Sequence, residues 1–160
     1  MAHDKTFPPH RIITSDPDET RRLGIDLGRR MNVGVMLLQG ALGAGKTTFV
    51  KGLAEGLGFK QAPREAGSPT FVLSREYPGR LPLIHIDLYR LDAIGPETGD
   101  WLIETFNRDA VVAVEWGERA LEWMPRDFLR IRFDHQDDGS RAIAFEVLGG
   151  MKFKNDGSKK

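Results

Sequence analysis

Short apolar runs alternate with amphipathic stretches along most of the chain. Three runs are rich in valine, isoleucine and leucine, at residues 33–38, 83–88 and 110–114, which is typical of strands buried on both faces. Helical spacing or helix-end signals mark four further stretches, at residues 17–31, 48–57, 97–106 and 117–123. We therefore predict parallel strands that alternate with helices, which is an α/β fold.

The other β signals lie toward the two ends of the chain and in its middle. Residues 11–14 form a short β-rich run, and residues 68–77 form a longer one. Residues 128–133 and 142–148 alternate apolar and polar positions across the turn at residues 137–140, which indicates a hairpin. The predicted fold is a single domain with a mixed, mostly parallel central sheet, flanking helices and a C-terminal antiparallel hairpin.

Length and charge indicate one globular domain. The 160 residues are 40% hydrophobic and 29% charged, which is enough for one core. We place the domain at residues 11–149, between a flexible leader (1–10) and a flexible basic tail (150–160). The 23 basic residues balance 23 acidic ones, so no overall field attracts nucleic acid or a membrane. With no cysteine and no long apolar segment, we expect a cytoplasmic protein with no membrane and no DNA partner.

Residues 40–48 read Gly-Ala-Leu-Gly-Ala-Gly-Lys-Thr-Thr and match G-x-x-x-x-G-K-[ST] at each fixed position. The segment lies between a predicted strand and a predicted helix, which is the order that a phosphate-binding P-loop needs. Backbone N–H groups in such a loop, together with the positive end of the helix, bind phosphates. Lys46 is expected to contact the β- and γ-phosphates, and the Thr47 hydroxyl to bind Mg²⁺. The residues expected to hold the nucleotide phosphates are Gly43, Ala44, Gly45, Lys46, Thr47 and Thr48.

A P-loop also needs an acidic partner for Mg²⁺ and a group that positions the attacking water or acceptor. Asp87 and Glu115 each end an apolar strand, and both are candidates for the catalytic and metal-binding roles. Thr70 is a candidate for a second hydroxyl on Mg²⁺, in a loop that senses the γ-phosphate. Several arginines are open candidates for stabilising the γ-phosphate charge: Arg64, Arg75, Arg90 and Arg119.

Two residues near these acids have plain structural interpretations. His85 shares a strand face with Asp87, and we interpret it as a hydrogen-bonded core residue rather than a metal ligand. Trp116 is either a core aromatic or a lid on the nucleotide, and core packing is the favoured interpretation.

Four blocks of sequence resemble a known family when they are taken in order and spacing. They are residues 42–49, 68–71 (Ser-Pro-Thr-Phe), 85–91 (His-Ile-Asp-Leu-Tyr-Arg-Leu) and 114–116 (Val-Glu-Trp). Together they resemble the TsaE (YjeE) family of bacterial ATPases. The blocks span residues 40–116, and the resemblance extends over nearly the whole chain apart from its two tails.

The resemblance implies a P-loop NTPase-like domain that binds ATP and Mg²⁺. It further implies an ATPase that supports threonylcarbamoylation of the adenosine next to the anticodon in tRNA. Such a protein docks onto a TsaD–TsaB complex and meets tRNA only indirectly. By resemblance, Lys46 holds the phosphates, Thr47 and Glu115 hold Mg²⁺, and Asp87 lies near the metal and the attacking water. The nucleotide base approaches Thr20, Gly139 and Arg141, and the residues expected to switch or to face a partner are Ser68, Thr70 and Trp116.

Other functions stay open at this point, because one fold supports many activities. A small-molecule kinase on the same scaffold would need an acceptor pocket. A module that binds nucleotide without hydrolysing it is the non-enzyme alternative. A GTPase is less favoured, because the sequence has no Asn-Lys-x-Asp base-reading motif.

Overall fold

The computed structural model describes residues 7–60, 64–65 and 72–154. Predictions that concern Ser68, Thr70, the first six residues or residues 155–160 lie outside this range. For Arg64 and Glu65 only the backbone is described.

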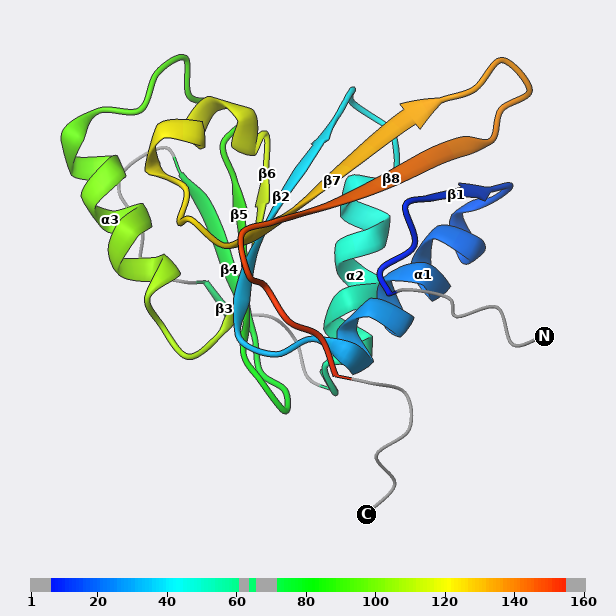
Figure 1. Ribbon diagram of the computed structural model, residues 1–160. Helices are drawn as coiled ribbons and strands as arrows, with labels where there is room; N and C mark the ends of the chain where they lie inside the picture. Colours follow the sequence, from blue (N-terminus) through cyan, green and yellow to red (C-terminus); the bar gives the residue numbers. More distant parts are fainter. Residues whose placement is uncertain (1–6, 61–63, 66–71, 155–160) are drawn as a thin grey trace.

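The described chain forms an α/β domain, as the alternating pattern predicts (Figure 1). The helices are α1 (Pro17–Arg30), α2 (Lys46–Gly56), α3 (Pro96–Phe106) and the 3-10 helix η1 (Gly117–Trp123). The strands are β1 (Arg11–Thr14), β2 (Gly34–Gly40), β3 (Arg64–Glu65), β4 (Leu73–Tyr77), β5 (Leu83–Asp87), β6 (Val111–Glu115), β7 (Phe128–His135) and β8 (Arg141–Leu148). No helix in the described ranges is long and apolar enough to cross a membrane.

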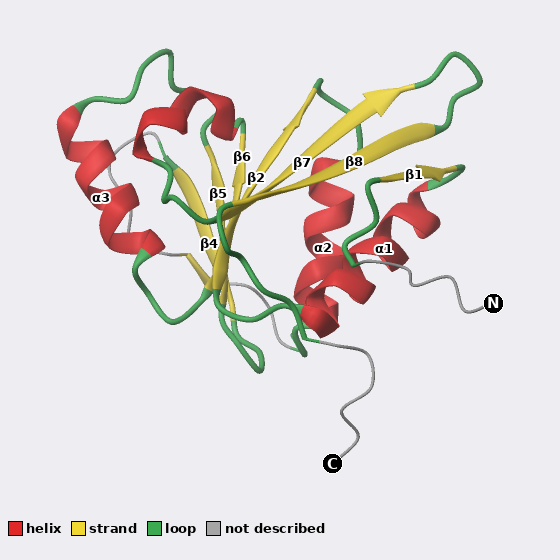
Figure 2. Cartoon of the chain, viewed as in Figure 1, coloured by secondary structure: helices red, strands yellow, loops and turns green. Residues whose placement is uncertain are grey.

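The strands form one sheet in the order β1-β8-β7-β2-β6-β5-β4-β3. Its four central strands, β7, β2, β6 and β5, are parallel, and antiparallel pairs extend it at both edges. The mixed sheet and its C-terminal hairpin are therefore confirmed, although antiparallel pairing was expected at one edge only. Helices α1 and α2 cover one face, and α3 with η1 lies on the other (Figure 2).

The central strands bring the predicted acids together at one end of the sheet. In the parallel register, Asp87 of β5 is the partner of Glu115 of β6, and Leu38 of β2 is the partner of Glu115 on the other side. The glycine loop leaves β2 two residues later. Loops that follow parallel strands meet at their carboxyl ends, which is where open α/β sheets bind ligands.

Helices α1 and α2 cross in very close contact, because glycines line the contact. A Cβ atom on Gly24 would lie 2.3 Å from the Phe49 carbonyl oxygen, and one on Gly52 would lie 2.0 Å from the Arg21 carbonyl oxygen. Gly28 and Gly56 meet in the same way one turn further along. Gly56, the last residue of α2, serves this close approach, and Gly58 (φ +88°) is the left-handed residue beyond the helix.

The described ends of the chain lie together against the domain. Phe153 forms an isolated bridge with Met31, and its ring meets the Phe7 ring edge-on at 5.4 Å. The Lys154 N–H also donates to the Arg30 carbonyl (2.8 Å). Apolar side chains near the two described ends of the chain therefore pack against each other, and the expected flexible leader and tail stay a prediction.

Candidate nucleotide site

The glycine loop has the backbone of a phosphate cradle. Gly40, Gly43 and Gly45 all have positive φ (+153°, +75° and +104°), which side-chain-bearing residues rarely adopt. No side chain caps the first turn of α2, so the N–H groups at this helix end face the loop without a side-chain acceptor. An uncapped helix N-terminus attracts anions through these N–H groups and the helix dipole.

Lys46 begins α2 and turns back over the loop. Its ammonium donates to the Gly40 carbonyl and, at 3.5 Å, to the Ala41 carbonyl. Its Nζ also lies 4.0 Å from the centre of the Trp116 ring. The side chain is only 5% exposed. Burial lowers the pKa of Lys46, while the negative charges of Glu115, Glu118 and Asp87 oppose that shift.

Glu115 is the buried acid of the site, at the last position of β6. The Thr47 hydroxyl donates to its carboxylate at 3.1 Å (Oε1) and 3.3 Å (Oε2), and His85 Nε2 lies 2.6 Å from Oε2. Burial alone would raise the pKa of Glu115. The hydrogen bonds from His85 and Thr47, with the charges of His85 and Lys46, outweigh that penalty and hold this pKa below its ordinary value of 4.5.

Asp87 lies beside Glu115 but is more open. Both acids line a cavity of about 200 Å³ together with Gly43 and residues 45–48 of the P-loop motif, whereas Ala44 is buried and does not line it. One Asp87 oxygen accepts the Tyr89 N–H at 2.9 Å, which shapes the turn after β5. The structure thus brings together both candidate acids, Lys46 and Thr47 in one cavity.

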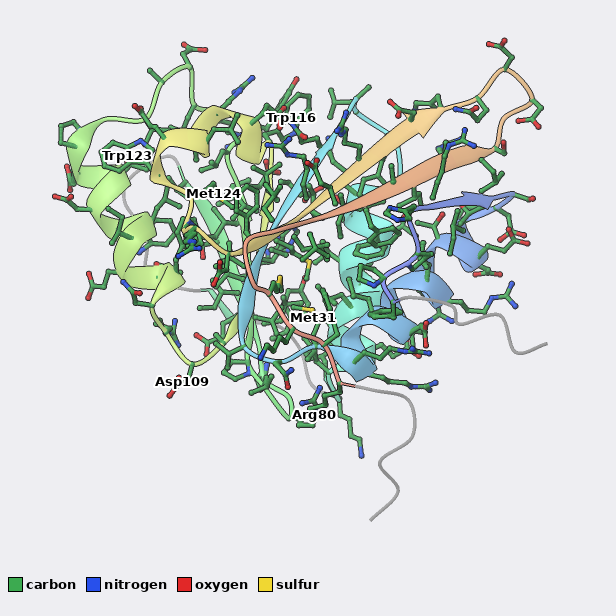
Figure 3. All side chains as sticks on the ribbon, viewed as in Figure 1. Met31, Arg80, Asp109, Trp116, Trp123 and Met124 are labelled. Carbon is green, nitrogen blue, oxygen red and sulfur yellow. The ribbon has the colours of Figure 1, made fainter. Side chains whose placement is uncertain are left out.

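Trp116 closes one side of this cavity, at the carboxyl ends of the central strands (Figure 3). Within the described chain it is the single non-glycine residue with positive φ (59°). Its ring packs against Tyr89, with 5.1 Å between ring centres, and against Lys46. Side chains in this backbone region are strained, and such strain concentrates at functional sites. Trp116 therefore lines the site and is not simply a core residue.

The candidate arginines have different surroundings. Arg119 donates to the carbonyls of Leu88 (3.2 Å) and Tyr89 (2.6 Å) and also to that of Leu91. Its guanidinium therefore holds the turn after β5. Arg75 lines a neighbouring cavity, Arg90 is exposed, and the Arg64 side chain lies outside the described range.

A second cavity, of about 130 Å³, adjoins the other side of the glycine loop. Its walls combine the start of α1, including Asp16 and Thr20, with the β7–β8 turn, including Gly139 and Arg141, and with Gly43, Gly45 and Thr48 of the loop. Arg141 donates to the Gly43 carbonyl at 3.3 Å. Thr20 and Thr14 share a buried hydrogen bond of 2.7 Å. The residues that the resemblance implies for the base thus surround one cavity beside the loop.

His85 is the residue that our interpretation of the sequence placed in the core without a role. It lies between Glu115 and a third cavity of about 440 Å³, whose walls include Thr47, Lys51 and Arg75. The alternation His85-x-Asp87 was the available signal, because it places His85 on the same face as Asp87. What the spacing could not show is that His85 reaches a carboxylate on the next strand.

No group of three or more histidine, cysteine, aspartate and glutamate side chains that could hold a metal ion occurs in the described ranges. Thr47 and Glu115 nevertheless fit Mg²⁺, which prefers oxygen ligands and commonly takes one or two protein groups plus phosphate oxygens. Their oxygens are 3.1 Å apart, close to the separation of about 2.9 Å between adjacent corners of an octahedron with bonds of about 2.0–2.1 Å. The N–H groups of the glycine loop and of the uncapped start of α2 fit phosphate oxygens, which accept hydrogen bonds.

Comparison with known proteins gives a consistent result. The model of the family described as "Threonylcarbamoyl adenosine biosynthesis protein TsaE" matches residues 14–143. A tRNA threonylcarbamoyladenosine biosynthesis protein TsaE from Treponema pallidum is 41% identical over 134 residues, covering 83% of this chain and 97% of its own length. The protein with the same name from Bacillus subtilis is 40% identical over 138 residues, covering 85% and 84%.

A solved structure shows the same architecture. The crystal structure of Bacillus subtilis YdiB superposes with a TM-score of 0.73 at 36% sequence identity, covering 87% of this chain and 85% of that one. Sequence and structural similarity therefore each extend over more than four fifths of the chain.

Proposed function

The chain belongs to the TsaE family of threonylcarbamoyl adenosine biosynthesis proteins, and on that premise we propose that it binds and hydrolyses ATP with Mg²⁺. Membership makes it a P-loop-type protein of tRNA threonylcarbamoyladenosine biosynthesis. We further propose that it acts on a TsaD–TsaB complex and meets tRNA through that complex. The cytoplasmic location expected from the sequence stays a prediction.

One observation carries the proposal: the Thr47 hydroxyl on the first turn of α2 is bonded to the buried Glu115 carboxylate, beside Lys46. An uncapped helix end, a lysine, a hydroxyl and an acid are the parts that P-loop proteins use for a nucleotide with its metal. When bound, Mg²⁺ would supply charge stabilisation at the phosphate oxygens. Thr47 and Glu115 are the residues that would hold it.

The remaining parts of the site have separate tasks. Lys46 would leave the Gly40 and Ala41 carbonyls and pair with the β- and γ-phosphates, which are stronger acceptors because they are charged. Asp87, more exposed than Glu115, would orient the attacking water. The smaller cavity between α1 and the β7–β8 turn would receive the base and ribose, with Thr20, Gly139 and Arg141 on its walls.

The cavity of about 440 Å³ keeps a small-molecule kinase as a second candidate. It shares Thr47, Asp87 and Glu115 with the phosphate cavity, and Lys51 and Arg75 give it positive groups. A phosphoryl acceptor with an anionic group would find suitable partners there. The relatives' names describe threonylcarbamoyladenosine biosynthesis and no kinase, so we keep the kinase as the second candidate.

Labelled ATP distinguishes these functions. The purified chain is incubated with γ-labelled ATP and Mg²⁺, alone, with a purified TsaD–TsaB complex, and with a metabolite extract. We expect free phosphate that increases when the complex is added. Transfer of the label to a small molecule in the extract would instead indicate kinase activity and would contradict the proposed hydrolysis. Bound nucleotide with no phosphate release, even with the complex, would make the chain a non-hydrolysing module.

A further inference from the structure

His85 makes the shortest contact to the buried acid of the site. Its Nε2 lies 2.6 Å from Glu115 Oε2, against 3.1 Å and 3.3 Å for the Thr47 contacts to the same carboxylate. The His85 side chain is 12% exposed and the Glu115 side chain 5%. A hydrogen bond between two groups this buried is poorly replaced by water, so it constrains the orientation of both.

The strand register explains how this contact forms. His85 of β5 is the direct partner of Ala113 of β6, and Asp87 is the direct partner of Glu115. Ala113 has only a methyl side chain, which leaves the space beside it free. The imidazole therefore reaches diagonally to Glu115, two residues further along the neighbouring strand, a distance that long side chains can span in a sheet.

Glu115 also has a competing partner. The Lys46 charge acts on this carboxylate, and the Glu115 charge acts on Lys46 in return. A carboxylate free to rotate would turn toward the ammonium and form a charge-assisted hydrogen bond. Such a bond would remove Lys46 from the phosphates and Glu115 from the metal at the same time.

We propose that His85 is the positioning residue of Glu115. Its Nε2–H donates to Oε2, which directs Oε1 toward the Thr47 hydroxyl and keeps the carboxylate apart from Lys46. His85 thereby presents a preset oxygen pair, Thr47 Oγ1 and Glu115 Oε1, to a divalent cation. This inference rests on the proposed function, because it assigns His85 to the metal that the nucleotide would bring. Groups that hold a metal ligand through a hydrogen bond typically change metal affinity or activity by about 10- to 100-fold when mutated.

Three variants test the inference. His85→Ala removes the donor, and His85→Gln retains an N–H at about the position of Nε2. His10→Gln, at an exposed position before β1, is the matched control for a histidine that lines neither cavity beside the glycine loop. For each variant, Mn²⁺ affinity is measured by electron paramagnetic resonance with ADP bound, and ADP affinity is measured separately in EDTA.

We expect His85→Ala to weaken Mn²⁺ binding by about 10- to 100-fold, with ADP affinity in EDTA unchanged. His85→Gln should recover most of the Mn²⁺ affinity, and His10→Gln should match the wild type. Unchanged Mn²⁺ affinity in His85→Ala would overturn the inference. So would an equal loss of ADP affinity in EDTA, which would indicate general damage to the fold, or a His85→Gln variant as weak as His85→Ala. A wild-type protein that binds no Mn²⁺ with ADP would instead overturn the proposed function.

Discussion

The phosphate end and the base end of the proposed nucleotide site differ in how deeply their polar groups lie. At the phosphate end, Lys46 and Glu115 are 5% and 4% exposed, and each is fixed by neighbouring groups. At the base end, Asp16 and Gly139 are exposed and Arg141 is half-buried, whereas Thr20 is buried, in its hydrogen bond with Thr14.

In the proposed site, the buried groups thus surround the reacting phosphates, and the more exposed groups surround the base. Buried polar groups lose much free energy when one partner is removed, because the other is left without water. Exposed groups exchange one partner for solvent at little cost. Substitutions of the buried groups at the phosphate end should therefore have large effects, whereas substitutions of the more exposed groups at the base end should have small ones.

The largest effect is expected at Lys46. Lys46→Ala removes the charged partner of two phosphates, and a loss of about 3 kcal/mol corresponds to roughly 100-fold weaker ATP binding. Isothermal titration with ATP and Mg²⁺ measures it. Lys60→Ala, an exposed lysine beyond α2, is the control. Unchanged ATP affinity in Lys46→Ala would remove the basis for the proposed nucleotide site.

Substitution of Glu115 should reduce ATP turnover much more than ATP binding. Glu115→Gln keeps the shape of the side chain but removes the charge that would hold Mg²⁺, so we expect phosphate release to fall on the order of 100-fold while nucleotide binding is largely retained. Phosphate release and ATP titration are measured side by side, with the exposed Glu122→Gln as control. Retained turnover in Glu115→Gln, with loss in Asp87→Ala, would show that the two acids have exchanged roles.

The effect of low pH on the free energy of unfolding should also differ between the two ends of the site. The folded-state pKa of Glu115 lies below its ordinary value of 4.5. The ionised carboxylate therefore stabilises the fold, and this contribution is complete above pH 4.5. The contribution is lost as pH falls through the lowered folded-state pKa. The difference in free energy of unfolding between wild type and Glu115→Gln should therefore be largest near neutral pH and shrink below pH 4.5.

Asp138, on the turn at the base end, is the matched control for this measurement. Hydrogen bonds from Ser140 lower its pKa as well, but it is fully exposed. Asp138→Asn should change the pH profile of unfolding less than Glu115→Gln does. Denaturant titrations from pH 3 to 7 make the comparison, and equal pH profiles for both variants would contradict the difference in burial.

The smallest effect is expected at Arg141. Arg141→Ala removes an exposed contact to the glycine loop, and such contacts contribute about 0.2–1 kcal/mol, or at most about 5-fold in ATP affinity. The loss should diminish with added salt, because exposed charges are screened. Arg132→Ala, an exposed arginine on β7 outside the cavity, is the control. A 100-fold loss would place Arg141 with the buried groups of the phosphate end.

The phosphate end could be predicted from sequence because its signals are local. Residues 40–48 carry their spacing within one segment, and Asp87 and Glu115 follow two of the clearest apolar runs. Strand order and register then bring them together, as parallel strands must. The base end was reached only through family resemblance, since nothing in residues 14–20 or 137–141 marks a ligand.

What the sequence did not indicate depends on contacts between elements. His85 of β5 contacts Glu115 of the neighbouring strand β6. Arg119 holds the turn after β5 and does not line the phosphate cavity. Trp116 has its left-handed backbone between β6 and η1, next to Gly117, which packs against Leu37 with no space for a Cβ atom. Such relations require the register and packing of neighbouring segments, which residue spacing does not contain.

The glycine-lined crossing of α1 and α2 fixes the spacing between two walls of the proposed nucleotide site. The start of α1 forms one wall of the base cavity, and the start of α2 forms the phosphate cradle. With Gly24 and Gly52 in backbone contact, the distance between these two walls is set by helix against helix rather than by flexible side chains. A single added methyl group at this crossing would force the walls apart. In the proposed site, the spacing between these two walls is therefore set at a helix contact that lines neither cavity.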